Sequence, residues 1–534
     1  MSRPICKSIA SIAVAVAVIC EARLGTATLS AQDKGRALVT VVLDPSLGVV
    51  PVSGRLLLLV SSESKPLDSI TPAAFGLEAE HQWIAAQEVA AWRPGEAVQI
   101  DIDEIAWPKP LSIAPDSEYQ VMALLDVDRN AGYIALSPND LRSRVIKTRN
   151  LRAVRELRLE QRVPAPPENY PEGQEPIDFV SPSLSAFWGR PITMRGIVVL
   201  PPGYRTNSER YPTIFFLHGY GANVATMRNG RARRSAEGMR DGDLPPMIWV
   251  LLDQSLPSGT HEFVDSVNNG PWGHALTLEL IPYIEKKYRM DSPAGRFLNG
   301  HSSGGWAALW LQIRYPESFG GTWATSPDSV DFRNFNNLDL YSDRNAYMRP
   351  EGSSTPLIRE DGRITQTLES AARQEVVVGE YGGQQSSFEW VFSPRAADGR
   401  PAPLFDRATG GISRDVAEHW RQHYDIAQIL GTQAAQLVPK LRRKIHVAVG
   451  TADQFHLDQP VRLLEERIKS LGYDATFTYL DGWTHFALIR DGKEVDRFGT
   501  GVMVRIASQM FARARPKAKW SPKTVPHPAS TLKN

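Results

Sequence analysis

The chain has 534 residues, of which 42% are hydrophobic and 22% are charged, and its formal net charge at pH 7 is +1. This length exceeds one ordinary core, and the composition is that of a globular protein rather than a disordered chain. A charge so close to zero argues against a uniformly basic surface, so no nucleic-acid partner is expected.

The first 31 residues have the pattern of a secretory signal peptide. Arg3 and Lys7 precede an uncharged stretch, residues 8–20, which is shorter than the roughly 20 apolar residues that span a bilayer. Ala31 ends an acceptable cleavage site. We therefore expect export to a periplasm or to the extracellular space, a mature chain that begins near Gln32, and no membrane span.

Both cysteines, Cys6 and Cys20, lie within this removable segment. The mature chain is therefore expected to have no disulfide, no cysteine nucleophile and no cysteine-ligated metal. Cys20 could instead carry a lipid, but the preceding Ile19 is bulkier than lipoprotein processing normally accepts.

Residues 32–163 are predicted to form a β-sandwich domain of the immunoglobulin-like type. Short apolar runs recur here between Pro, Gly, Asp and Ser, and no helical pattern alternates with them. The short apolar runs of this segment are ALVTVVL, GRLLLLV, AVQIDI, YQVMALLDV and RELRLEQRV. The arginines near the end of the segment could bind a polyanion, but the preferred interpretation is that they lie on a solvent-exposed face of a strand.

Asp126, Asp128 and Asn130 begin like a calcium-binding loop. An EF-hand needs glycine at the sixth position and a bidentate glutamate at the twelfth, whereas this chain has Ala131 and Ser137 there. A plain turn is the preferred interpretation, and no metal site is expected.

The Pro-rich segment 164–185 is predicted to be a linker, because closely spaced prolines stiffen a chain and pack poorly. In residues 186–510, short, fully apolar runs alternate with helical patterns, which predicts an α/β domain with a mostly parallel sheet. The alternation lapses over 327–438, where aromatic residues crowd, and we expect this insertion to cap the edge of the sheet. The basic tail 511–534 is predicted to be disordered. The apolar runs are RGIVVL, PTIFFLHG, PMIWVLLD, GRFLNG, GGTWATS, KIHVAVG and ATFTYLDG.

The stretch GHSSG, residues 300–304, fits G-x-S-x-G, a strained turn that presents a nucleophilic serine. The apolar run RFLNG leads into it, and a helical pattern follows up to Pro316, as this turn requires. Gly300 and Gly304 are expected because a side chain would clash where the backbone turns tightly. Ser302 is therefore the candidate nucleophile, and a Gly-Ser loop without chemistry is the alternative.

A serine nucleophile needs a base and a carboxylate that orients the base. On a sheet of this type the order along the chain is serine, acid, histidine. The run KIHVAVG leads into Asp453, and the next run, ATFTYLDG, leads into a loop that contains His485. Both residues are therefore expected beyond the carboxyl ends of neighbouring strands. Less favoured acids are Asp458, which suits a helix N-cap, and the turn residues Asp474 and Asp481; less favoured bases are His446 and His456.

An oxyanion hole needs two backbone N–H groups aimed at the developing charge. One is expected from Ser303, directly after the nucleophile, and the other from Tyr220 in the loop after the run FFLHG. Gly219 and Gly221 flank Tyr220 and would let this backbone approach a substrate. An ordinary glycine-rich turn is the alternative.

Four stretches of the chain resemble the putative-esterase family of α/β-hydrolases, which includes feruloyl and acetyl esterases, enterochelin esterase, S-formylglutathione hydrolase and the mycolyltransferases. They are PTIFFLHGYGAN, NNGPWGHALTLELIPYIEKKYR, GHSSGGWAALW and GTADQF…DGWTHF. The resemblance covers about residues 190–325 and 440–490 and leaves out the predicted sandwich and cap. It implies Ser302 as nucleophile, Asp453 as acid, His485 as base, and backbone donors at Tyr220 and Ser303.

Together these features predict an exported serine hydrolase that cleaves a carboxylic ester, either a small molecule or one linked to a polysaccharide, without metal or organic cofactor. A peptidase or an acyltransferase could use the same triad. A glycan-binding protein on an inactive hydrolase scaffold is the alternative from another class, although such proteins commonly lose one of the three residues. The aromatic residues of the insertion could bind a hydroxycinnamoyl group or a sugar, or could form the core of the cap.

Overall fold

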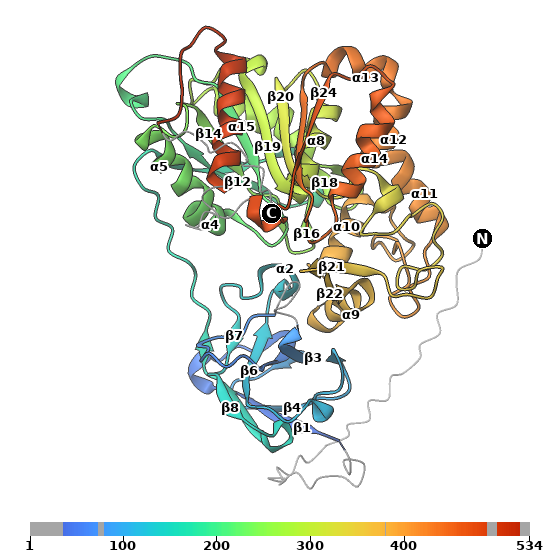
Figure 1. Ribbon diagram of the computed structural model, residues 1–534. Coiled ribbons are helices and arrows are strands. Elements are labelled where there is room, and N and C mark those ends of the chain that lie inside the picture. The colour runs from blue at the N-terminus through green and yellow to red at the C-terminus, as the bar shows by residue number, and fades with distance from the viewer. Residues whose placement is uncertain (1–35, 73–79, 380, 489–498, 524–534) are drawn as a thin grey trace, which may run out of the picture. The chain divides into compact units, whose positions relative to one another are not determined.

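The computed structural model describes residues 36–72, 80–379, 381–488 and 499–523, and residues from Ala37 onward belong to one compact unit (Figure 1). The predicted signal peptide lies outside the described residues. Within the described ranges, no helix is both long and apolar enough to cross a membrane.

Two β-sheets occupy the N-terminal part of this unit. The first has three strands in the order β4-β1-β9, and the second has the order β10-β7-β6-β2-β3-β5, with β8 paired to β6. Strand β3 was not predicted, because its alanine and glutamate residues are depleted in strands. The bounds are β1 Leu38–Leu43, β2 Val52–Ser61, β3 Gln82–Trp92, β4 Ala97–Asp101, β5 Ala106–Trp107, β6 Tyr119–Asp126, β7 Leu141–Arg142, β8 Ile146–Thr148, β9 Glu156–Leu159 and β10 Gln161–Arg162.

Strand β2 is buried on both faces, which explains its uninterrupted run of leucines. Leu56 and Leu58 pack in one cluster with Val41 of β1 on the three-stranded sheet. Leu57 points to the opposite face, as successive strand residues do, and packs with Val377 of helix α9 (Leu368–Val378). The two sheets share a core as a sandwich would, while a separate immunoglobulin-like domain over 32–163 stays a prediction.

The predicted linker, residues 164–185, contains regular secondary structure from residue 174 onward. Strand β11 (Gln174–Val180) pairs antiparallel with β12 (Thr193–Val199), and helix α3 (Pro182–Trp188) follows β11. Pro176 is tolerated because β11 is an edge strand, where a missing N–H breaks no sheet hydrogen bond. The linker assignment is therefore wrong from residue 174 onward.

The largest sheet has eight strands in the order β11-β12-β14-β13-β19-β20-β23-β24 (Figure 1). Strand β12 pairs antiparallel with both its neighbours, and every other pair from β14 to β24 is parallel. All seven apolar runs predicted as strands in this part are confirmed. The remaining bounds are β13 Thr213–Leu217, β14 Ile248–Leu252, β19 Arg296–Ser302, β20 Gly321–Pro327, β23 Ile445–Gly450 and β24 Ala475–Leu480.

Helices cover both faces of this sheet, so its central strands, such as β13 and β14, are buried along their whole length. In β13, Phe216 packs in the cluster that contains residues of α5 (Arg233–Asp241) and α15 (Gly499–Ala514). Phe215 packs on the other face, with residues of α7 (Ile281–Glu285) and α8 (Ser303–Arg314). A mostly parallel sheet between two helical layers is the α/β-hydrolase fold that was expected. Shorter elements are α4 Val224–Met227, β15 Ser255–Leu256, β16 Gly259–Thr260, β17 Asp265–Ser266, β18 Gly270–Pro271 and α6 Trp272–His274.

The insertion between β20 and β23 contains a hairpin and a group of helices. Its aromatic side chains mostly lie in a core that the insertion shares with α8 and β23, because Phe388, Phe392, Phe405, Trp420 and Tyr424 are all buried in one cluster with residues of those elements. That burial leaves them out of contact with a ligand at the surface. The insertion consists of β21 Pro356–Glu360, β22 Arg363–Thr367, α9, α10 Gln384–Phe392, α11 Arg414–His423, α12 Ile426–Thr432 and α13 Ala434–Leu441, and α14 Asp458–Lys469 follows β23.

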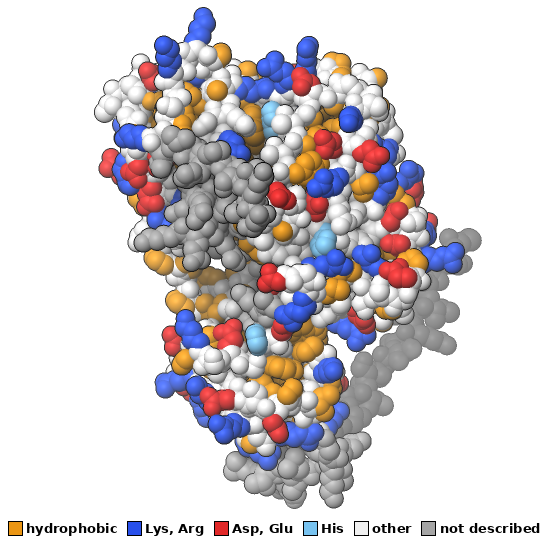
Figure 2. Space-filling view, in the orientation of Figure 1, with side chains coloured by type: hydrophobic (Ala, Val, Ile, Leu, Met, Phe, Trp, Pro, Cys, Tyr) orange, Lys and Arg blue, Asp and Glu red, His pale blue; other side chains and the backbone are white. Residues whose placement is uncertain are grey.

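The tail expected to be disordered from residue 511 is structured up to residue 523. Helix α15 continues to Ala514, and the guanidinium of Arg515 pairs with the Asp291 carboxylate at 2.6 Å. The ring of Trp520 packs on Phe511. Acidic and basic side chains are mixed over the face of the molecule shown in Figure 2.

Candidate active site

Ser302 lies at the junction of β19 and α8 in a conformation that residues other than glycine rarely adopt. Its φ is 57° and its ψ is −127°, and such strain persists only where the surrounding structure enforces it. A Cβ on Gly300 would lie 2.0 Å from the carbonyl oxygen of Gly304, and a Cβ on Gly304 would lie 2.2 Å from that of Leu217. Both glycines are therefore required by backbone contacts, as the G-x-S-x-G motif predicts.

Asp453 and His485 lie at the carboxyl ends of the adjacent strands β23 and β24 and form a buried pair. The distance from Asp453 Oδ2 to His485 Nδ1 is 2.8 Å. The other carboxylate oxygen of Asp453 accepts the backbone N–H of Phe455 at 2.9 Å, which fixes its orientation. A carboxylate at Nδ1 favours the tautomer with the proton on that nitrogen, leaving Nε2 as an acceptor.

The ring of His485 is also held by aromatic neighbours. Its centroid lies 4.4 Å from that of His301 and 4.9 Å from that of Phe455. Its backbone N–H donates to Oε1 of Gln454 at 2.7 Å. The imidazole therefore has one orientation, which general-base chemistry at Nε2 requires.

The hydroxyl of Ser302 donates to a carboxylate that was not predicted, that of Asp328. Ser302 Oγ lies 3.0 Å from Asp328 Oδ1, and Ser303 Oγ lies 2.7 Å from Asp328 Oδ2. Burial raises the pKa of the Asp328 carboxyl. In this structure the serine proton is directed to Asp328, although Ser302 and His485 line one cavity. Catalytic hydrogen bonds are often loose before substrate binds.

A sequence signal for Asp328 exists. It follows β20 directly, and β20 pairs with the strand that ends in Ser302. Asp453 also lies just beyond the carboxyl end of a strand, because β23 ends at Gly450. A search for carboxylates after every strand next to the nucleophile strand would have found it.

The loop after β13, residues 219–222, is the predicted oxyanion loop. A Cβ on Gly219 would lie 3.3 Å from the Cβ of Ser302, so this backbone approaches Ser302 closely. Tyr220 lines the same cavity as Ser302. Ser303, the other predicted donor, is the first residue of α8, where backbone N–H groups are not used by the helix.

A short helix from the N-terminal part, α2 (Ala131–Ile134), holds the oxyanion loop in place. The hydroxyl of Tyr220 donates to the carbonyl of Gly132 at 2.7 Å, and that of Tyr133 donates to the carbonyl of Ala222 at 2.8 Å. The two tyrosine rings pack edge to face, with centroids 5.1 Å apart. The strand-rich N-terminal part therefore contributes to the position of this loop.

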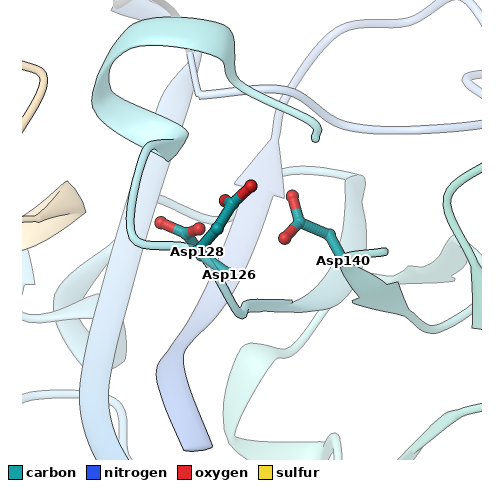
Figure 3. Close-up of side chains that lie close together, drawn as sticks. All are labelled: Asp126, Asp128 and Asp140. Carbon is teal, nitrogen blue, oxygen red and sulfur yellow. The ribbon is translucent and has the colours of Figure 1, made fainter. Parts of the chain in front are cut away.

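Three carboxylates lie beside α2: Asp126, Asp128 and Asp140 (Figure 3). They form the acidic cluster, in which one oxygen from each of the three carboxylates lies within 4.8 Å of the other two. Asp126 accepts the backbone N–H of Asn130 and of Ala131, which anchors the start of α2, and Asp140 accepts those of Val127 and Ser137. Burial raises the pKa of Asp126 to about 6 and that of Asp140 to about 7. These backbone contacts give Asp126 and Asp140 a role in holding this turn.

The less favoured acids and bases of this part of the chain lie elsewhere. Asp458 is the first residue of α14 rather than its N-cap, and its carboxylate pairs with Arg462 at 3.2 Å. The N-cap expectation for Asp458 is therefore wrong. Asp481 accepts the hydroxyl of Thr451. His446 stacks on Trp323, and burial lowers its pKa to about 4.

A cavity of about 240 Å³ opens over Ser302 and His485. Apolar side chains form much of its wall, including Phe216, Met227 and Phe455, and Arg231 and Arg234 also line it. A strained serine, a buried acid–histidine pair and an adjoining glycine-rich loop around one cavity are the parts that acyl transfer requires.

Comparison with known proteins agrees with this arrangement. The sequence profile of the putative esterase family matches residues 189–478, which is more than half of the chain. The chain belongs to the putative esterase family. This membership confirms the resemblance seen in the sequence motifs.

Individual relatives of this esterase-family protein are distant. Over 130 residues it is 28% identical to the endo-1,4-beta-xylanase/feruloyl esterase of Xylanibacter ruminicola, a match that covers 23% of this chain and only 18% of the length of that relative. Among solved structures, a ferulic acid esterase is 16% identical with a TM-score of 0.37, and the match covers 64% of this chain and 98% of that one. An S-formylglutathione hydrolase from Agrobacterium tumefaciens is 17% identical with a TM-score of 0.36 and the same coverage.

Proposed function

We propose that this esterase-family protein is an exported serine hydrolase that cleaves carboxylic esters through an acyl-enzyme. The observation that carries the proposal is the buried 2.8 Å contact between Asp453 and His485, with His485 and Ser302 lining one cavity. Family membership supports the same reaction type. No metal or organic cofactor takes part in the proposed reaction.

The proposed reaction begins when the Ser302 hydroxyl turns from Asp328 toward Nε2 of His485. His485 takes the proton while Ser302 Oγ attacks the ester carbonyl carbon, and Asp453 stabilises the imidazolium that forms. Backbone N–H groups of Tyr220 and Ser303 are proposed to bind the oxyanion. His485 then protonates the leaving alcohol, and water, deprotonated by His485, releases the acid from Ser302.

Export is proposed from the first 31 residues of the sequence. Basic residues before a short uncharged stretch are typical of a signal peptide. N-terminal sequencing of the protein from its native host should give a chain that starts near Gln32. An intact Met1 in a cytosolic fraction would contradict export.

Labelling with a fluorophosphonate followed by mass spectrometry tests the nucleophile. The wild-type protein should carry the label on Ser302, and Ser302→Ala should hydrolyse esters about 10⁶-fold more slowly. Ser303→Ala is the matched control, because it retains the backbone N–H and the nucleophile, and should remain labelled at residue 302. A folded wild-type protein without label would favour a non-catalytic, glycan-binding role.

A substrate panel separates hydrolysis of esters from the related reactions. p-Nitrophenyl esters, methyl hydroxycinnamates and acetylated glycans represent small and polysaccharide-linked esters, and p-nitroanilide peptides represent peptidase substrates. Product analysis with an added alcohol distinguishes acyl transfer from hydrolysis. Turnover of anilides but not of esters would refute the proposal.

A further inference from the structure

Five arginines lie in the segment 228–240, and three of them have partners away from the cavity. The guanidinium of Arg228 donates to the carbonyl of Pro167 at 2.7 Å. Arg233 pairs with Glu237 at 3.1 Å and Arg240 pairs with Asp241 at 3.0 Å, both at exposed positions. These three arginines are accounted for by local contacts of the fold.

The other two, Arg231 and Arg234, line the cavity that also contains Ser302 and His485. They are three residues apart, where side chains project from the same face of a helical segment. Arg231 is buried, and its guanidinium lies 5.2 Å from the centre of the Phe216 ring. Both arginines also interact with other groups of the protein.

Among the described residues that line this cavity, Arg231 and Arg234 are the basic ones besides histidines, and none is an aspartate or a glutamate. The charge extends to the nucleophile turn. Burial lowers the pKa of His301 well below its ordinary value, and the neighbouring His485 and Arg231 lower it further. Charges act more strongly on one another in such a partly desolvated site than in water.

We propose that the substrate is an ester with an anionic group, and that Arg231 and Arg234 bind this group. The inference rests on the proposed function and names the class of ester. A guanidinium binds carboxylate, phosphate and sulfate through paired N–H donors. Phe216, Met227 and Phe455 in the same wall fit an apolar or aromatic body for the remainder of the molecule.

Two pairs of rigid esters test this proposal and locate the anion. 4-Acetoxybenzoate and 4-acetoxybenzamide differ by a carboxylate on the alcohol side, and monomethyl terephthalate and methyl 4-carbamoylbenzoate differ by a carboxylate on the acid side. The para geometry prevents the carboxylate from attacking its own ester. Each kcat/KM is divided by the spontaneous hydrolysis rate, so that leaving-group reactivity cancels within a pair.

In at least one pair, the anionic ester should be preferred by about 10- to 100-fold, the usual size of a hydrogen bond to a charged group. The preference should decrease between 20 mM and 500 mM NaCl, because salt screens the interaction. In the double variant Arg231→Gln, Arg234→Gln, the ratio of the corrected kcat/KM of the anionic ester to that of the neutral ester should fall to near one. Arg233→Gln is the matched control and should keep the wild-type ratio, because this arginine pairs with Glu237 at an exposed position.

A ratio of one or less for the wild-type protein in both pairs would overturn the proposal. The proposal would also be overturned if the double variant hydrolysed the neutral and the anionic ester more slowly by the same factor. The arginines would then support the fold or the transition state of any ester, rather than bind an anionic group. If the double variant does not fold, two other measurements test the proposal. The single variant Arg234→Gln should lower the anionic-to-neutral ratio, and the wild-type ratio should fall as salt is added; an unchanged ratio in both measurements would overturn the proposal. Failure of the proposed function looks different, since neither member of either pair would be hydrolysed and Ser302 would carry no fluorophosphonate label.

Discussion

Asp453→Asn should lower kcat about 10⁴-fold while the protein stays folded. Asparagine fills the same space, but its amide N–H can donate to Nδ1 of His485 where the carboxylate accepts. The imidazole would then carry its proton on Nε2, which could no longer accept the proton of Ser302. His485 is only 2% exposed, so water cannot readily restore the productive tautomer.

The size of this effect follows from the geometry of the pair. A 10⁴-fold loss corresponds to about 5.5 kcal/mol in the activation barrier. The contact is 2.8 Å long and both side chains are buried, so the carboxylate stabilises the imidazolium in a site of low dielectric. A weak, exposed pair would give a much smaller effect.

The assay is the hydrolysis of p-nitrophenyl acetate, with kcat and KM measured separately for three variants. Asp458→Ala is the control, because its carboxylate pairs with Arg462 on the same helix and should contribute about 0.5 kcal/mol to stability and little to rate. Asp328→Asn is the rival, since Asp328 accepts the Ser302 hydroxyl. We expect it to change kcat about 10-fold at most, the size of one hydrogen bond. The reasoning fails if Asp328→Asn is the inactive variant and Asp453→Asn retains a tenth of the wild-type rate.

Three further predictions concern the supports of the site. Gly304→Ala should destabilise the fold by about 3 kcal/mol, because the new Cβ would lie 2.2 Å from a backbone oxygen; chemical denaturation measures this, and soluble protein of wild-type stability would contradict it. Tyr133→Phe removes the hydrogen bond to the oxyanion loop and should lower kcat about 10-fold with little change in KM; a fall in stability alone would show a purely structural role. Asp128→Asn should stabilise the protein at pH 8 by about 1 kcal/mol and have little effect at pH 5. The carboxyls of Asp126 and Asp140, with pKa values of about 6 and about 7, are mostly charged at pH 8 and repel a neighbouring carboxylate there, whereas they are largely protonated at pH 5. Urea denaturation at both pH values measures this, and an equal effect at both would refute it.

Features encoded by a few consecutive residues were predictable from the sequence. The nucleophile turn needs Gly300 and Gly304 because their Cβ positions are occupied by backbone atoms of nearby residues. The central strands of the large sheet, such as β13 and β14, are short apolar runs because both their faces are covered. The pairing of Asp453 with His485 also followed, since consecutive strands joined by one helix lie side by side and their carboxyl ends meet.

Only the tertiary structure decided which residues from distant segments meet at the site. Asp328 contacts Ser302 because β20 lies beside β19 in the sheet, and Tyr133 reaches the oxyanion loop from 89 residues away in the chain. The same holds for Arg231 and Arg234, which line the cavity, whereas three arginines in the same segment do not. Periodicity and turn residues specify local backbone geometry, while these contacts depend on strand order and on the packing of elements far apart in the chain. The sequence by itself therefore predicted the strands of the large sheet, the strained turn at Ser302 and the acid–histidine pair, and the tertiary structure decided which residues form the walls of the cavity.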